Sequence, residues 1–121
     1  MRIVITGASS GLGKHLALGY ASNDNELVLL ARREQKLEEV AAQCTLLGAK
    51  AETIVSDVND FEIMKNIGTQ LAQKHIDLTI LNAGISVGPS GGITPFEDFH
   101  CLLPTTFLSV HALLERIIPK L

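Results

Sequence analysis

Residues 6–13 read TGASSGLG and directly follow RIVI, a short run at residues 2–5 that is typical of a β-strand. Gly7, Gly11 and Gly13 give the spacing G-x-x-x-G-x-G. A glycine turn between a strand and a helix lets a phosphate approach the backbone, where N–H groups point outward and the helix dipole favours negative charge. The stretch therefore predicts a strand, a turn that can bind an anion, and a helix. When the glycines are considered alone, a tight turn without a ligand remains the alternative.

The phosphate-binding loop of nucleotide hydrolases has a different spacing, G-x-x-x-x-G-K-[ST]. Gly13 and Lys14 match its end, but Ala8 stands at the first glycine position. His15 stands where that loop needs a magnesium-binding hydroxyl. The sequence therefore argues against a nucleotide hydrolase.

The rest of the chain alternates between strand-like and helix-like periods. Further strands are expected at 26–31, 51–56 and 77–82. Helices are expected at 12–21, at 34–47 before Gly48, and after a capping box formed by Asn59 and Glu62. The second helix should bury Leu37, Val40, Ala41, Cys44 and Leu47, and the third Ile63, Met64, Ile67 and Leu71.

This alternation predicts a Rossmann-type, doubly wound α/β fold that forms a single domain over residues 1–121. Right-handed crossovers give the strand order 3-2-1-4. Strands one and four then flank the point where the strand order reverses, and open α/β sheets bind ligands there. The glycine turn and Asn82 are both expected at this crevice.

The chain changes in composition after Asn82. Residues 83–95 are rich in Gly, Ser and Pro and are expected to form a loop, and residues 96–103 a short helix. A last helix is expected at 105–118, with one apolar stripe and further apolar residues beside it. The stripe contains Leu103, Phe107, Val110, Leu114 and Ile117, and Leu108, Leu113 and Ile118 lie beside it. So widely apolar a helix is normally covered on two sides, which predicts that the chain associates through residues 105–118 and does not persist as a monomer.

Composition and charge argue against several classes of protein. The net charge is −3 with no basic run, so no nucleic-acid partner is expected. No apolar run approaches the roughly 20 residues that a membrane span needs, and no signal-peptide pattern is present.

The cysteines and histidines show no functional spacing. Cys44 and Cys101 lack C-x-x-C spacing and are expected to be reduced thiols, which favours a cytoplasmic location. The histidines lack ligand-like spacing, so no metal site is expected; they are His15, His75, His100 and His111.

Four motifs together resemble the short-chain dehydrogenase/reductase family. They are TGASSGLG after the first strand, LLARREQKL after the second, SDV after the third and LNAG after the fourth. The resemblance implies an NAD(P)-binding domain and hydride transfer to or from a carbonyl or alcohol carbon. It implies contacts to the diphosphate and ribose from the glycine turn, that is, from Gly7, Ser9, Ser10, Gly11, Leu12 and Gly13. It likewise implies adenine contacts from Asp57 and Val58, and ribose contacts from Asn82, Ala83 and Gly84.

The end of the second strand favours one cofactor. Dinucleotide folds usually carry an acidic residue about 20 positions after the glycines, to hold the ribose 2′-hydroxyl. Here Arg32 and Arg33 occupy that region instead. Guanidinium groups bind phosphate with two parallel hydrogen bonds, so NADP(H) is favoured over NAD(H).

The family's chemistry needs a Tyr-x-x-x-Lys pair and an upstream Ser, and none of them can be assigned here. The only tyrosine, Tyr20, lies in the first helix, with Asp24 four residues later. Thr106 stands where the family has an asparagine in the long helix. The chain is therefore expected to carry the cofactor-binding half of such an oxidoreductase and to be inactive alone. The alternative is a non-catalytic dinucleotide-binding or interaction module.

Overall fold

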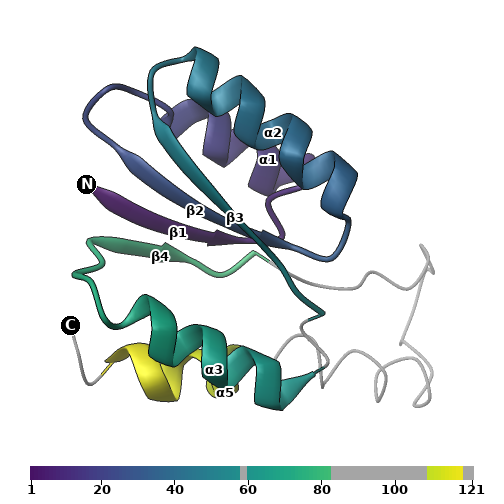
Figure 1. The fold of residues 1–121 in the computed structure, drawn as a ribbon, viewed down its shortest axis with the longest axis vertical. Coiled ribbons are helices and arrows are strands. Elements are labelled where there is room, and N and C mark those ends of the chain that lie inside the picture. Colours follow the sequence, from purple (N-terminus) through teal and green to yellow (C-terminus); the bar gives the residue numbers. More distant parts are fainter. Residues whose placement is uncertain (58–59, 83–108, 119–121) are drawn as a thin grey trace, which may run out of the picture.

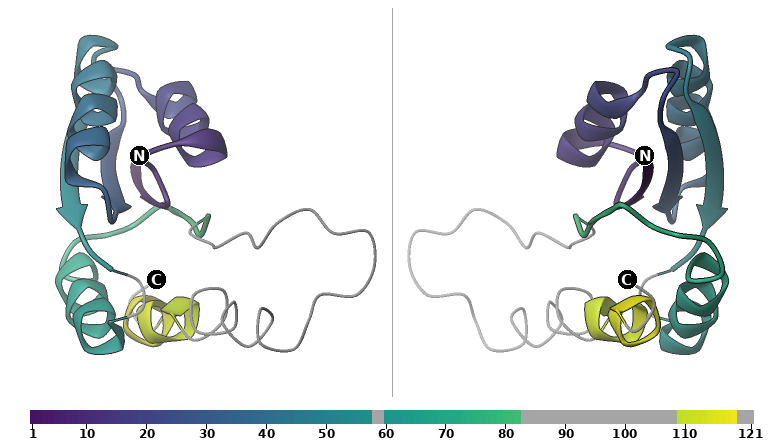
Figure 2. Two further views of the ribbon diagram at one scale, coloured as in Figure 1. Left: turned by 90° about the vertical axis from the view of Figure 1, so that its right-hand side faces the viewer. Right: turned by 90° about the vertical axis from the view of Figure 1, so that its left-hand side faces the viewer.

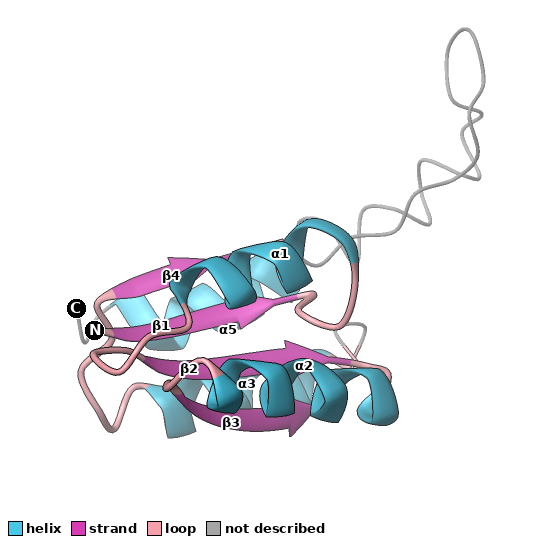
Figure 3. Ribbon diagram, turned by 90° about the horizontal axis from the view of Figure 1, so that it is seen from above, coloured by secondary structure: helices cyan, strands magenta, loops and turns pink. Residues whose placement is uncertain are grey.

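A computed structural model of the chain describes residues 1–57, 60–82 and 109–118. Four parallel strands form one sheet (Figure 1): β1 (Arg2–Thr6), β2 (Glu26–Ala31), β3 (Lys50–Val55) and β4 (Leu78–Ile80). Their order is β3-β2-β1-β4, which confirms the predicted order 3-2-1-4. Figure 3, which looks at the sheet from above, shows the strands side by side and pointing the same way.

The described helices lie on both faces of this sheet. They are α1 (Gly11–Tyr20), α2 (Glu34–Leu46), α3 (Phe61–Leu71) and α5 (Ser109–Ile117). Figures 1 and 2 show α1 and α2 over one face, and α3 and α5 over the other. The fold is therefore doubly wound, as predicted. The short helix expected at 96–103 and the loop at 83–95 lie outside the described residues.

The two central strands are buried on both faces, which explains their unbroken apolar sequences. Successive side chains of a strand point to opposite faces. Ile3 and Leu27 accordingly pack in one core cluster with α1 and α2. Val4 and Val28 pack in a second cluster with α3 and α5. A run without apolar–polar alternation is what a strand covered on both faces requires.

Helix α2 ends close to its predicted boundary. Gly48 follows the C-cap with φ 102°, a left-handed conformation that favours glycine. Four of the five expected core residues of α2 are buried: Leu37, Val40, Ala41 and Cys44. The prediction was wrong for Leu47, which is the C-cap residue and is exposed. Cys44 is a free, buried thiol, and Cys101 lies outside the described residues.

The predicted start of α3 needs a correction. Its N-cap is Asp60, whose Oδ1 accepts a hydrogen bond from the backbone N–H of Ile63 at 3.2 Å. The expected cap, Asn59, was therefore wrong by one residue. An aspartate at the cap accepts from a free N–H and also places its charge favourably on the helix dipole. Met64, Ile67 and Leu71 are buried as predicted, but Ile63 is 43% exposed.

The buried side of α5 also differs from the predicted stripe. Ala112, Leu113 and Ile117 are buried, whereas Leu114 is only half-buried. The helix packs closely on Gly68 of α3, where an added Cβ would stand 2.9 Å from the carbonyl oxygen of Leu113. On this helix Leu113, rather than the predicted Leu114, packs in the core with α3. The other members of the stripe, Leu103, Phe107 and Val110, lie outside the residues whose side chains are described.

Among the helices that the structure describes, none has the length and apolar character to cross a bilayer.

Candidate functional site

The carboxyl ends of the strands meet at one edge of the sheet. Strand register pairs Thr6 with Leu30, Ile5 with Ile80 and Ala31 with Val55, so the strands end at similar heights. The residues that follow each strand therefore gather at this edge. They are the glycine turn after β1, the two arginines after β2, Ser56 and Asp57 after β3, and Asn82 after β4.

Two glycines give the turn its backbone conformation. Gly7 has φ 64° and Gly11 has φ 56°, both in the left-handed region that residues with a side chain rarely adopt. Between them, the backbone N–H of buried Ala8 donates to the carbonyl oxygen of Leu30 at 3.2 Å, which fixes the turn against β2. A Cβ built on Gly11 would meet no atom within 4 Å from the other described parts of the chain, its own helix backbone aside. The turn thus leaves open space directly over Gly11.

Gly13 is needed for a different reason, close packing. A Cβ there would overlap the carbonyl oxygen of Gly7 and stand 2.7 Å from Nδ2 of Asn82. Its absence lets the first turn of α1 lie directly against the glycine turn and the end of β4.

Asn82 holds the end of β4 to this turn. Its backbone N–H donates to Thr6 Oγ1 at 3.0 Å, and its Nδ2 donates to the carbonyl oxygen of Gly7 at 3.4 Å. The predicted residues Gly7, Gly13 and Asn82 are thus in mutual contact. Sequence reasoning missed Thr6, which is buried. The available signal was a hydroxyl residue at the end of an otherwise apolar strand, directly before the turn.

The start of α1 faces this open space. Its N-cap residue, Ser10, makes no side-chain hydrogen bond to the helix, and the first turn contains no acidic residue. Ser9 is half-buried, whereas Ser10, Gly11 and Leu12 are exposed. Leu12 is 64% exposed, which is unusual for a large apolar side chain. The start of the helix therefore offers backbone N–H groups and a positive dipole end to an anion, with an apolar side chain beside them.

The predicted arginines lie at the end of β2. Arg32 and Arg33 are both exposed, and neither forms an ion pair with any residue in the described ranges. Arg33 is also the N-cap residue of α2. A side chain without an acceptor oxygen cannot cap a helix, so Arg33 lies against the local preference. Two guanidinium groups are therefore free to bind a ligand next to the glycine turn.

The remaining predicted residues are described only in part. Asp57 is exposed at the end of β3, and Val58, Ala83, Gly84 and Thr106 lie outside the described residues. Ser56, directly before Asp57, is only 5% exposed, and its hydroxyl has no hydrogen-bond partner among the residues that the structure describes. Its backbone N–H donates to the carbonyl oxygen of Ala31 at 3.0 Å, which holds the end of β3 against the end of β2.

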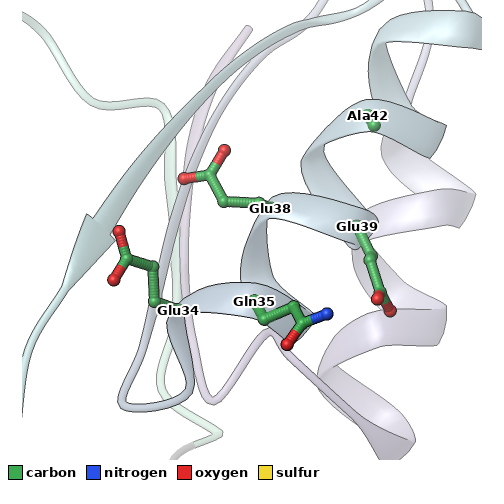
Figure 4. A pocket seen from close by; sticks show the side chains of 5 residues that line it. All are labelled: Glu34, Gln35, Glu38, Glu39 and Ala42. Carbon is green, nitrogen blue, oxygen red and sulfur yellow. The ribbon is translucent and has the colours of Figure 1, made fainter.

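A surface hollow on α2 is chemically unlike this site. It is lined by Glu34, Gln35, Glu38, Glu39 and Ala42. Figure 4 shows Glu34 and Glu38 extending to one side of the helix, and Gln35 and Glu39 to the other. Glu38 accepts a hydrogen bond from Thr53 Oγ1 of β3 at 2.6 Å. Carboxylates repel phosphate, so this hollow is not a candidate for an anionic ligand.

No group of His, Cys, Asp and Glu in the described residues could hold a metal ion.

Comparison with known proteins identifies the family. The family model described as short chain dehydrogenase matches residues 1–121, and the chain belongs to this family. It is 36% identical over 99 residues to the hydroxysteroid 11-beta-dehydrogenase 1-like protein B of Xenopus laevis. The aligned residues make up 79% of this chain and 33% of that protein. It is 32% identical over 132 aligned positions to the sepiapterin reductase of Chlorobaculum tepidum, covering 94% of this chain and 53% of that protein.

Solved structures agree with this assignment. The structure of a putative NAD(P)-dependent gluconate 5-dehydrogenase from Beutenbergia cavernae, with bound NADP, superimposes with a TM-score of 0.85. The two sequences are 27% identical, and the match covers 98% of this chain and 48% of that one. The chain thus spans about a third to a half of the length of these relatives.

The glycine turn fits the dinucleotide that this family binds. The open space over Gly11 and the uncapped start of α1 leave room for a diphosphate. The close contact at Gly13 leaves no room for a side chain between the turn and the helix. The donor groups that remain, backbone N–H and guanidinium, suit phosphate rather than a metal ion or an apolar ligand.

Proposed function

We propose that the chain is the NADP(H)-binding half of a short-chain dehydrogenase/reductase, folded as a single dinucleotide-binding domain. In this proposal the glycine turn binds the diphosphate, and Arg32 binds the 2′-phosphate with help from Arg33. Asp57 and Val58 contact the adenine, and Asn82 with the two residues after it contacts the ribose next to the nicotinamide. When bound, the nicotinamide supplies or accepts the hydride that is exchanged with a carbonyl or alcohol carbon.

The observation that carries the choice of cofactor is the pair of exposed arginines, Arg32 and Arg33, which form no ion pair with the residues that the structure describes. Cations at the start of a helix oppose the dipole by roughly 0.3–1 kcal/mol each, and both arginines stand at the start of α2. A 2′-phosphate offsets this cost and matches the guanidinium geometry. The NADP bound in the Beutenbergia cavernae structure supports the same choice.

Calorimetric titration with NADPH and NADH tests the proposal. Arg32→Ala should raise the Kd for NADPH more than about tenfold, the loss of one charge-assisted hydrogen bond, and leave the Kd for NADH unchanged. Arg116→Ala is a matched control, because Arg116 is an exposed arginine on α5, over the other face of the sheet. Equal losses for both nucleotides would contradict the role in 2′-phosphate binding. A wild-type chain that binds neither nucleotide would contradict the dinucleotide site itself.

The catalytic Ser and the Tyr-x-x-x-Lys pair of the family cannot be assigned to residues of this sequence. Tyr20 packs against the core between α1 and the sheet, and no Tyr-x-x-x-Lys pair occurs in the 121 residues. A positioned proton donor contributes about 10²–10⁴-fold to such reactions, so we expect no dehydrogenase turnover from the purified chain. Catalytic oxidation of NADPH by a preparation free of host reductases would contradict this expectation.

A non-catalytic dinucleotide-binding or interaction module is the second candidate. It is favoured by the lack of a Tyr-x-x-x-Lys pair in the 121 residues. The coding DNA beyond codon 121 separates the two candidates. An in-frame continuation with Tyr-x-x-x-Lys favours the oxidoreductase, and a stop codon favours the module.

Two further expectations belong to this proposal. The free, buried thiol of Cys44 is consistent with the cytoplasmic location favoured by the cysteine usage. Self-association through residues 105–118 is supported by two large apolar side chains that remain exposed on the α3 and α5 layer, those of Ile63 and Ile118.

A further inference from the structure

A lysine lies next to the glycine turn, and neither the family motifs nor the proposed phosphate contacts account for it. Lys14 is the fourth residue of α1, and its backbone N–H donates to the carbonyl oxygen of Ser10 at 3.3 Å. Its side chain is half-buried. It forms no ion pair with any residue in the part of the chain that the structure describes.

Helix geometry places this lysine over the open part of the turn. Residues three and four apart share a side of a helix, so Lys14 shares its side with Gly11 and Ser10. Both of these are exposed, and a Cβ on Gly11 would meet no described residue of another segment within 4 Å. Side chains on a helix lean toward its N-terminus, and a lysine side chain is long enough to span one turn. The Lys14 ammonium can therefore extend over the space in front of Gly11.

The charges around the start of α1 make this position unfavourable without a ligand. A cation near a helix N-terminus opposes the dipole. Helices α2 and α3 carry an acid in their first turn, Glu34 and Glu62, whereas α1 and α5 carry none. The positive charge near the start of α1 is therefore not balanced by a carboxylate in that turn. An anion over Gly11 would balance it.

We propose that Lys14 neutralises the diphosphate of the bound dinucleotide, an inference that rests on the proposed function. The backbone N–H groups of the turn carry no formal charge, so they leave the two negative charges of the diphosphate uncompensated. Arg32 is assigned to the 2′-phosphate, which only NADP(H) carries. Lys14 should therefore contribute equally to the binding of NADPH and NADH, which separates its role from that of Arg32.

Calorimetric titration of Lys14→Met with NADPH, NADH and ADP-ribose tests this inference. Methionine keeps most of the apolar stem and removes the charge. The Kd should rise about tenfold for all three ligands, because each contains the diphosphate. Lys14→Arg should restore binding to within about threefold of the wild type. Lys50→Met is the matched control, since it makes the same charge change at the start of β3, the opposite end of the sheet, and should leave the three Kd values unchanged.

The outcomes separate this inference from the proposed function. If the wild type binds the nucleotides and Lys14→Met binds them equally well, the inference is wrong and the proposed function stands. A loss confined to NADPH would also overturn it, because Lys14 would then bind the 2′-phosphate. If the wild type binds none of the three ligands, the proposed function fails, and this inference with it. Should Lys14→Met not fold, Lys14→Gln is measured in its place with the same expected result.

Discussion

The backbone N–H of Asn82 donates a hydrogen bond to Thr6 Oγ1 at 3.0 Å, which joins the ends of β4 and β1. Strand β4 is only three residues long, and among the described strands it pairs with β1 alone. The side chain of the same asparagine reaches the carbonyl oxygen of Gly7. One residue therefore holds a short edge strand to both the central strand and the glycine turn, so the site and the sheet edge depend on the same contacts.

Replacing Thr6 with valine tests this connection. Valine has nearly the shape of threonine but cannot accept the hydrogen bond, so the N–H of half-buried Asn82 loses its partner. We expect the free energy of unfolding to fall by about 1–2 kcal/mol in urea titrations. Thr6→Ser keeps the hydroxyl and should lose clearly less. A Thr6→Val variant as stable as the wild type would contradict the stabilising role of this hydrogen bond.

Gly13 and Gly19 form a natural pair for a second test, since both lie in α1. A Cβ on Gly13 would overlap the Gly7 carbonyl, whereas a Cβ on Gly19 would meet nothing within 4 Å. Gly13→Ala should therefore lower the free energy of unfolding by about 2 kcal/mol or more, as overpacking does. Gly19→Ala should raise it by about 0.5–1 kcal/mol, because alanine favours the helix. Thermal unfolding of both variants measures the difference, and a Gly13→Ala variant as stable as wild type would contradict the packing described for the turn.

The strands could be predicted well because their chemistry is local. The apolar runs of β1 and β2 lack alternation because Ile3 and Val4, for example, enter different cores on opposite faces. Once these strands were placed, the right-handed crossover rule gave their order. The glycine turn could also be predicted from local sequence, because the backbone at Gly7 and Gly11 has a positive φ that favours glycine.

The buried faces of the helices were harder to predict. Periodicity shows which residues share an apolar side of a helix, but not which of them a neighbouring helix or the sheet will cover. Gly68 allows α5 to approach α3 closely, and in this arrangement Leu113 is buried while Leu114 is half-buried. Ile63 belongs to the apolar side of α3 by spacing, yet it is 43% exposed. Thr6 was missed for a similar reason, because its partner Asn82 lies 76 residues away.

We expect the carboxyl group of Asp77 to make the free energy of unfolding depend on pH. It lies before β4, at the amino end of the sheet, where its Oδ2 accepts from the backbone N–H of Arg2 at 2.7 Å and its Oδ1 contacts His75 Nε2 at 3.1 Å. The hydrogen bond from Arg2 is the main cause that holds the pKa of this carboxyl below its ordinary value. Because the pKa is lower in the folded state, Asp77 contributes stability above the unfolded pKa of about 3.9, and this is lost as the pH falls through the folded value.

Urea unfolding at a series of pH values measures this contribution. Asp77→Asn does not titrate, so its free energy of unfolding should fall less than that of the wild type as the pH drops from about 5 to about 3. Glu52→Gln is the control, since Glu52 is an exposed carboxylate on β3, and it should keep the wild-type dependence. An Asp77→Asn variant with the wild-type pH dependence would contradict the role of the Arg2 hydrogen bond.

Self-association through residues 105–118 is the last prediction. Ile118, directly after α5, is 57% exposed, and Ile63 of α3 is 43% exposed. Figure 1 shows α3 and α5 over the same face of the sheet. Light scattering at micromolar concentration should give the mass of a dimer or a higher oligomer for the wild type. Ile118→Glu should shift the mass toward the monomer, because a desolvated charge in an apolar interface is costly. Phe107→Glu should do the same; Phe107 lies outside the described residues but within the predicted interface.

Leu46→Glu is the matched control for these variants. Leu46 is 87% exposed on α2, over the opposite face of the sheet, so its replacement should leave the mass unchanged. A monomeric wild type would exclude the oligomer, and dissociation by Leu46→Glu alone would place the interface on the other layer of helices.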